Sequence, residues 1–136
     1  MKSNKRLLQI MPLLTILLFA CQSNKHEYMN KENNHNLIVL VKYKTQTSKS
    51  EEAIASLTKL IEAVKSEPNF IKITMHSDLK DQTNILLYEE WSDEAYCNGD
   101  HMKTAYIQQF MEDSRAFLAG TPEITQWKIE KSFSSK

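Results

Sequence analysis

The hydrophobic pattern of the chain changes its period several times between residues 37 and 133. Residues 37–41, with the sequence LIVLV, form a continuous apolar and β-branched run, which is typical of a strand covered on both faces. Apolar and polar positions alternate in residues 69–77 (NFIKITMHS), and this alternation predicts a second strand. Residues 84–91 (NILLYEEW) and 122–133 (PEITQWKIEKSF) predict a third and a fourth strand.

Residues 48–67 have the helical period instead of alternation. Apolar residues recur at helical spacing, while lysine and glutamate occupy the other side of the helix. The apolar positions are Ile54, Leu57, Ile61 and Val64. Ser48 and Glu51 have the spacing of an N-terminal capping box, and Pro68 ends the helix after Glu67. The pattern predicts a helix that packs one face on a sheet.

A second helix is predicted from His101 to about Ala119. Residues 92–100, which precede it, form a short helical turn followed by a break. Asp100 is a natural N-cap for a helix that begins at His101, and Gly120 is a natural C-cap.

The element order is therefore β-α-β-β-α-β, which predicts an α+β fold of the ferredoxin-like type. Such a unit forms one antiparallel sheet with both helices on the same face. The third strand is apolar on both sides, because Ile85, Leu87 and Trp91 alternate with Leu86 and Tyr88. A folded segment of this length cannot cover the second face of its own sheet. The pattern therefore predicts a homodimer in which two sheets face each other.

The first 20 residues are organised differently. Lys2, Lys5 and Arg6 precede an uncharged, mostly apolar run from residue 7 to residue 19. This run is shorter than the roughly 20 apolar residues that span a bilayer. A positive start followed by a short apolar run and a small residue predicts a secretory signal peptide over residues 1–20.

Residues 18–21, LFAC, resemble a bacterial lipobox, which implies a signal peptide cleaved before a lipidated Cys21. The alternative is a cysteine that follows an ordinary signal peptide. Lipidation would anchor the protein to a membrane of the bacterial envelope, and Gln22 favours the outer membrane in an organism with two. Residues 21–36 are polar and rich in asparagine, so we expect a flexible tether. The folded domain is expected to span residues 37–136.

The charge balance excludes one class of partner. The chain has 17 basic and 17 acidic residues, and cleavage of the signal peptide leaves 14 basic against 17 acidic residues. A nucleic-acid-binding domain needs a basic face, so no nucleic-acid partner is expected. With Cys21 lipidated, Cys97 has no cysteine to pair with in the same chain. It is a buried apolar residue, a partner for another chain or a reactive thiol, and the first is favoured.

The segment YEEWSDEAYCNGDHMKTAYIQQF, residues 88–110, resembles the antibiotic biosynthesis monooxygenase family and its quinol monooxygenase members. The resemblance rests on Glu89, Trp91, Ala95, His101, Tyr106 and Phe110. It implies a dimeric α+β barrel and oxidation of a quinol by O₂ without a cofactor. The chain departs from the family pattern in two ways: one extra residue lies between Trp91 and His101, and Tyr106 stands where many members have a second histidine.

The resemblance implies a functional role for five residues, and for each of them the sequence also permits a purely structural role. His101 is the candidate proton acceptor, and its alternative role is a hydrogen bond to a neighbouring loop. Trp91 is the second candidate catalytic residue, because its N–H could orient a substrate; the alternative is a core residue. The expected substrate-binding residues are Tyr106, Glu89 and Phe110. Their alternatives are a polar bond across the dimer for Glu89 and core packing for the two aromatic residues.

No metal or organic cofactor is expected. The four histidines, at positions 26, 35, 76 and 101, never occur at helical ligand spacing. Only Gly99 and Gly120 are available, so no glycine-rich nucleotide-binding loop can form.

The leading hypothesis is an envelope-tethered, cofactor-independent monooxygenase that acts on a quinol or related phenol. The alternative is a non-catalytic dimeric barrel that binds a small apolar ligand. A haem-degrading relative is disfavoured, because His101 and Met111 stand where those members carry other residues.

Overall fold

The computed structural model of the protein describes residues 36–135, and the predicted signal peptide, Cys21 and nearly all of the tether lie outside this range. The elements in chain order are β1 (Leu37–Lys44), α1 (Ser50–Val64), β2 (Phe70–Ser77), β3 (Asn84–Trp91), α2 (Glu94–Asn98), the 3-10 turn η1 (His101–Lys103), α3 (Ala105–Asp113), the 3-10 turn η2 (Ser114–Ala116) and β4 (Glu123–Lys128).

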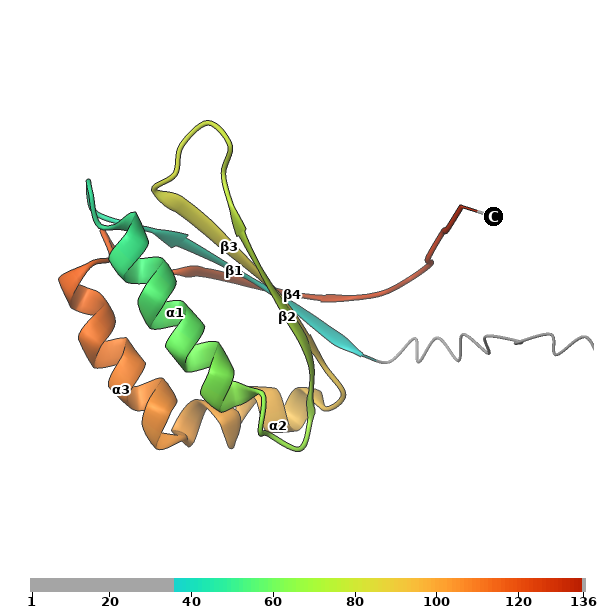
Figure 1. The fold of residues 1–136 in the computed structure, drawn as a ribbon. Coiled ribbons are helices and arrows are strands. Elements are labelled where there is room, and N and C mark those ends of the chain that lie inside the picture. The colour runs from blue at the N-terminus through green and yellow to red at the C-terminus, as the bar shows by residue number, and fades with distance from the viewer. Residues whose placement is uncertain (1–35, 136) are drawn as a thin grey trace, which may run out of the picture. The chain divides into compact units, whose positions relative to one another are not determined.

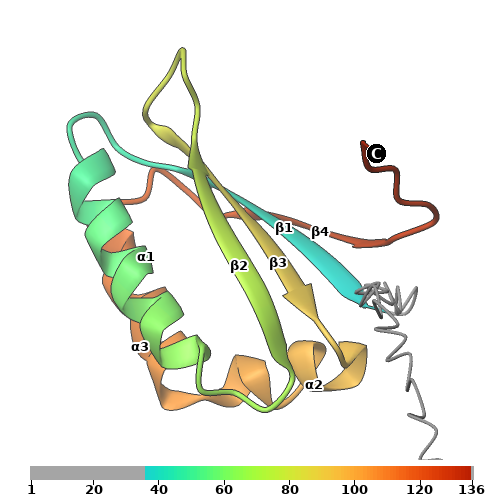
Figure 2. The same cartoon turned by 45° about the vertical axis from the view of Figure 1, so that its right-hand side comes forward.

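The four strands form one antiparallel sheet in the order β2-β3-β1-β4. Helices α1 and α3 lie side by side on one face of this sheet, and α2 lies near the end of β3 (Figure 1, Figure 2). The α+β ferredoxin-like prediction is confirmed. The order follows from the connections, because each helix links two strands that are not direct neighbours in the sheet.

The core lies between the sheet and the two long helices. Strand β1 directs alternate residues from Leu37 to Tyr43 toward the helices, and β3 does the same from Ile85 to Trp91. Helix α1 contributes its fully buried Leu57 to this core. The helical period of residues 48–67 had indicated this face, so both the helix and its orientation follow from the sequence pattern.

The opposite face of the sheet carries apolar side chains but no helix among residues 36–135. Ile38 is buried there, Leu40 and Tyr88 are half-buried, and Trp127 of β4 is exposed. In β3 the residues on this face alternate with buried ones. The prediction that the third strand is apolar on both sides is thus confirmed, while the homodimer stays a prediction.

The predicted helix from His101 to Ala119 is wrong in its continuity. Thr104 has an extended ψ of 144°, which separates η1 from α3. Both the N–H and the hydroxyl of Thr104 donate to the His101 carbonyl, at 3.1 and 2.8 Å. This local bonding competes with helix continuation. The predicted caps are also wrong, because Asp100 makes no capping bond and Gly120 lies beyond η2.

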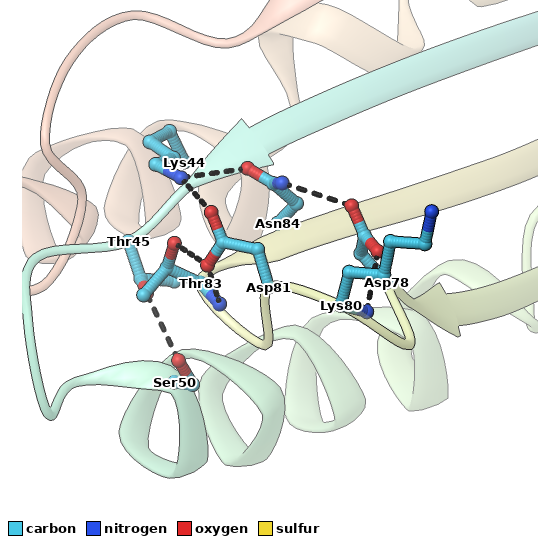
Figure 3. Close-up of polar contacts among 8 residues, drawn as sticks. All are labelled: Lys44, Thr45, Ser50, Asp78, Lys80, Asp81, Thr83 and Asn84. Atoms are coloured by element: carbon cyan, nitrogen blue, oxygen red, sulfur yellow. Dashed lines mark hydrogen bonds and ion pairs between the residues drawn. The ribbon is translucent and has the colours of Figure 1, made fainter.

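The capping box predicted at Ser48 and Glu51 does not form. Ser48 has a φ of +64°, and Lys49 is the residue that precedes helix α1, without a side-chain cap. The Ser50 hydroxyl lies 3.1 Å from the Thr45 hydroxyl instead (Figure 3). Helix α1 therefore begins at Ser50, one residue later than a capping box at Ser48 requires.

The hairpin between β2 and β3 is bonded to the end of β1. Lys44 Nζ donates to Asp81 at 2.6 Å and to Asn84 at 2.9 Å, and the Thr83 N–H donates to Asp81 at 3.0 Å (Figure 3). These bonds, with that from Lys44 the largest cause, lower the pKa of Asp81 to about 2. The turn between β2 and β3 is thus bound to the sheet by a carboxylate that stays ionised.

Candidate functional site

A cavity of about 700 Å³ lies between the helix-facing side of the sheet and helices α1 and α3. Most of its wall is apolar, and β1, α1 and α3 contribute residues such as Val41, Ile61 and Phe110. Ile124 of the edge strand β4 also lines it and is 56% exposed, so the cavity opens toward this edge. A cavity of this size and character fits one small, largely apolar molecule.

His101 lines this cavity and is itself 93% removed from solvent, with 7% of its surface exposed. Its Nδ1 lies 2.9 and 3.0 Å from the two carboxylate oxygens of Glu67, within hydrogen-bond distance of both. Among residues 36–135, no hydrogen bond reaches its second nitrogen, Nε2. The imidazole thus has one nitrogen held by the protein and one that remains available.

Glu67 lies in the connection between α1 and β2. Pro68 cannot continue the helix, and the Glu67 N–H donates to the Val64 carbonyl at 2.9 Å in the final turn. The turn directs the Glu67 carboxylate into the protein, where the residue is 8% exposed. There it also accepts a hydrogen bond of 2.5 Å from the Tyr106 hydroxyl. One buried carboxylate therefore joins the start of β2 to η1 and α3.

Trp91 contacts the His101 ring but does not line the cavity. Its side chain is fully buried, and its ring centroid lies 4.5 Å from that of His101, with the planes tilted by 55°. The indole N–H donates to Glu89 Oε2 at 3.0 Å. The N–H that was expected to orient a substrate is therefore already bonded. Trp91 supports the His101 ring and the Glu89 carboxylate.

Glu89 brings a carboxylate to the cavity wall. It is 9% exposed, and burial raises the pKa of its carboxyl group, against the opposing effect of the hydrogen bond from Trp91. A polar bond across a dimer was the expected alternative role, yet the partner is Trp91 of the same chain. Its other oxygen, Oε1, has no hydrogen-bond partner in the part of the chain that the structure describes.

The two aromatic residues expected to bind substrate lie in different places. Phe110 lines the cavity, and its ring centroid lies 6.2 Å from that of Tyr43 and 6.2 Å from that of Phe117. Tyr106 does not line the cavity, because its hydroxyl is directed to Glu67. Phe110 can therefore contact a ligand directly, whereas Tyr106 contacts Glu67.

Cys97 is buried at the cavity wall. Burial raises the pKa of its thiol to about 12, with smaller contributions from Glu89 and other carboxylates. A thiol that stays protonated is a poor nucleophile. This environment favours the expected role of a buried apolar residue.

Glu67 is the residue that the sequence pattern did not reveal. It is 34 positions away from His101 along the chain, and its position before Pro68 indicated only the end of a helix. Within residues 36–135, no group of three histidine, cysteine, aspartate or glutamate side chains could hold a metal ion. In the same range, no helix has the length and apolar character needed to cross a membrane.

Comparison with known proteins connects this site to a family. The sequence profile of the family described as antibiotic biosynthesis monooxygenase matches residues 36–113. Among curated protein sequences, none matches the chain.

Several solved structures share the fold. A candidate antibiotic biosynthesis monooxygenase from Nitrosomonas europaea is 18% identical, with a TM-score of 0.66 over 71% of this chain and 91% of that one. A conserved protein from Methanosarcina mazei is 21% identical, with a TM-score of 0.63 over 68% and 90%. A Bacteroides thetaiotaomicron protein of unknown function, described as a possible oxidoreductase, is 16% identical, with a TM-score of 0.63 over 71% and 99%.

Proposed function

The chain belongs to the antibiotic biosynthesis monooxygenase family, and on this premise we propose that it oxidises a quinol or related phenol with O₂, without a cofactor. The observation that carries the proposal is the apolar cavity of about 700 Å³ with His101 in its wall. The available Nε2 of His101 is a proton acceptor for a phenolic hydroxyl of a ligand held there.

The reaction uses the electron-rich substrate as its own reductant. His101 takes the phenolic proton, and the phenolate gives one electron to O₂. The two radicals combine to form a peroxide on a ring carbon that carries a hydrogen, and His101 returns its proton to the outer oxygen. Loss of water, which takes the ring hydrogen, leaves a carbonyl at that carbon. One oxygen atom enters the product and the other leaves as water, so no external reductant is needed.

The protein contributes orientation and the exclusion of water. Apolar side chains such as Val41, Leu87 and Phe110 surround the ring of the substrate and keep the radical pair together. Glu89 is a polar group of the same wall, and its Oε1 accepts a hydrogen bond from a second hydroxyl of the substrate. Trp91 and Tyr106 do not line the cavity. Trp91 packs against the His101 ring, and Tyr106 donates a hydrogen bond to Glu67.

The test is O₂ uptake by the full chain with reduced menadione, measured against the rate without protein. We expect His101→Ala to lower the protein-dependent rate by about 10²–10⁴, the usual range for loss of an acid–base group. His76→Ala is the matched control, because His76 is exposed on β2 and does not line the cavity. Equal rates for wild type and His101→Ala, per folded molecule, would refute the role of His101.

A non-catalytic binding protein is the second candidate, and one observation favours it. Two of the polar side chains expected at the substrate, Trp91 and Tyr106, are bonded to carboxylates and do not line the cavity. A binding protein would bind menadione, detected as quenching of tryptophan fluorescence, without any protein-dependent O₂ uptake. The same preparation therefore distinguishes the two functions.

We also propose that the domain is anchored to the bacterial envelope through a lipidated Cys21 and the tether of residues 21–36. The support is the sequence LFAC after a positive and apolar leader. Cys21→Ser should move the protein from the detergent phase to the aqueous phase in a partitioning experiment, or leave the precursor uncleaved. Unchanged partitioning and processing would refute the anchor.

A further inference from the structure

We propose that Glu67 is the positioning residue of the site: it holds His101 in the tautomer whose Nε2 is unprotonated and open to the cavity. This inference rests on the proposed function, because it assigns the group that prepares His101 as a proton acceptor. The resemblance to the family did not include Glu67, and the inference comes from the contacts of the folded chain.

The contact between Glu67 and His101 is bifurcated and buried. Nδ1 lies 2.9 Å from Oε1 and 3.0 Å from Oε2, and the two side chains are 4% and 9% exposed. Oε1 of Glu67 also accepts a hydrogen bond from the Tyr106 hydroxyl, so we assign the carboxylate as the acceptor of this contact and Nδ1 as its donor. In a neutral imidazole the other nitrogen is then the acceptor, since the partner of one nitrogen determines the state of the other.

The free nitrogen has access to open space. No fully buried side-chain nitrogen or oxygen of residues 36–135 lacks a hydrogen-bond partner. Nε2 of His101 has no partner there, so it is not fully buried. His101 lines the cavity whereas Glu67 does not, and the imidazole therefore separates the carboxylate from the ligand space.

Tyr106 holds the carboxylate in turn. Its hydroxyl donates to Glu67 Oε1 at 2.5 Å. Burial, followed by this hydrogen bond, raises the pKa of Tyr106 to about 12, so the hydroxyl keeps its proton and remains a donor. The chain of contacts runs from α3 through the connection before β2 to η1. Tyr106 orients Glu67, Glu67 orients His101, and His101 lines the cavity.

Trp91 restricts the imidazole from another side. Its ring lies 4.5 Å from the His101 ring between centroids, and it is fully buried against Phe70 at 6.1 Å. A ring held by a bifurcated hydrogen bond at Nδ1 and by a tryptophan against its side has little freedom to rotate. A purely structural ion pair would need neither the open Nε2 nor its position at the cavity.

The first measurement is independent of activity. Nitrogen-15 NMR of the imidazoles distinguishes protonated from unprotonated ring nitrogens, and His101→Gln identifies the His101 signals in the full chain. At a pH where these signals no longer change, we expect Nδ1–H and a bare Nε2 in the wild type. Glu67→Ala should lose this preference, and Glu62→Ala, the matched control at an exposed position of α1, should keep it.

The second measurement is kinetic. Glu67→Ala should lower kcat for reduced menadione by roughly 10- to 10²-fold, the usual effect of removing the partner that orients a ligating or catalytic histidine. KM should change little, because Glu67 does not contact the cavity. Glu67→Gln should restore part of kcat, since its amide oxygen can still accept the Nδ1–H bond.

The outcomes separate the two proposals. A wild type with Nε2–H in place of Nδ1–H overturns the positioning role, even if Glu67→Ala does not fold. A folded Glu67→Ala that keeps both the tautomer and kcat overturns it as well. A wild type with the expected tautomer that consumes no O₂ refutes the oxidation of the quinol alone, and the assignment of Glu67 remains.

Discussion

Glu89 carries an acidic side chain into a wall that is otherwise largely apolar. Burial raises the pKa of its carboxyl group above the ordinary 4.5, and the Trp91 hydrogen bond offsets only part of that effect. A buried carboxylate that is not fully hydrogen-bonded destabilises the folded state when it ionises. Its presence in the cavity is therefore better explained by contact with a ligand than by stability.

Glu89→Gln should stabilise the protein, and the gain should grow with pH. The folded state keeps a proton that the unfolded chain loses, so wild-type stability falls as pH rises from about 4.5 through the higher folded-state pKa of Glu89. Glutamine does not ionise, so the variant does not lose stability in this way, and the glutamine oxygen can still accept a hydrogen bond from the Trp91 N–H. We expect a gain of about 1–3 kcal/mol near pH 8 and little difference near pH 4, measured by urea unfolding.

Glu51→Gln is the control for this prediction. Glu51 is exposed in the first turn of α1, so its removal changes the net charge by the same amount without relieving burial. A stability difference for Glu89→Gln that does not depend on pH would contradict the assignment of a raised pKa to Glu89.

Helix α1 forms as predicted, but its N-terminus differs from the prediction. Its length and apolar face follow from the sequence, yet the helix starts without a side-chain cap, because the chain enters it through Ser48 at a φ of +64°. This left-handed conformation is unfavourable for residues with a Cβ atom and natural for glycine.

Ser48→Gly should raise the free energy of unfolding by roughly 0.5–1 kcal/mol, because glycine adopts a positive φ without the clash of a Cβ atom. A capping box would give the opposite sign, since loss of the Ser48 hydroxyl would then remove a hydrogen bond. Thermal or urea unfolding measures the difference. Thr47→Gly, at the exposed neighbouring position, should not stabilise, and a gain of the same size there would contradict this account.

At the scale of the whole molecule, the open face of the sheet is the feature without a partner. Ile38, Leu40, Tyr88 and Trp127 lie on that face, and within residues 36–135 only the other face is covered by helices (Figure 2). We propose that a second copy of the chain covers it, sheet against sheet. Such an interface would bury more than about 2,000 Å² in total.

The wild type should therefore sediment as a dimer at micromolar concentration. Trp127→Lys should weaken dimerisation at least about tenfold, because it places a charge in the apolar contact while the 58% exposed side chain contributes little to the fold of the single chain. Leu79→Lys is the matched control, since Leu79 is fully exposed at the hairpin tip and lies off the sheet face. A folded wild-type monomer at these concentrations would refute the dimer.

Several features of the fold follow from the sequence alone. The change between alternating and helical periods indicates the four strands, helix α1 and the order that produces an antiparallel sheet with helices on one face. These features are determined locally, because the period of apolar residues reports which face of an element is buried. The same pattern indicated apolar residues on both sides of β3. For the site, the resemblance to the family implied His101, Glu89 and Phe110, and all three line the cavity.

The tertiary structure alone decided how these residues are connected. Glu67 contacts His101 across 34 positions of sequence, and only the packing of the α1–β2 connection against η1 brings them together. The same packing directs the Trp91 N–H to Glu89 and the Tyr106 hydroxyl to Glu67, away from the cavity. The break at Thr104 was also not predicted from the sequence. The Thr104 hydroxyl donates to the His101 carbonyl, and the period of apolar residues does not report such a local side-chain bond. Periodicity identifies buried faces, but the partners of buried polar atoms are determined by the three-dimensional arrangement of the elements.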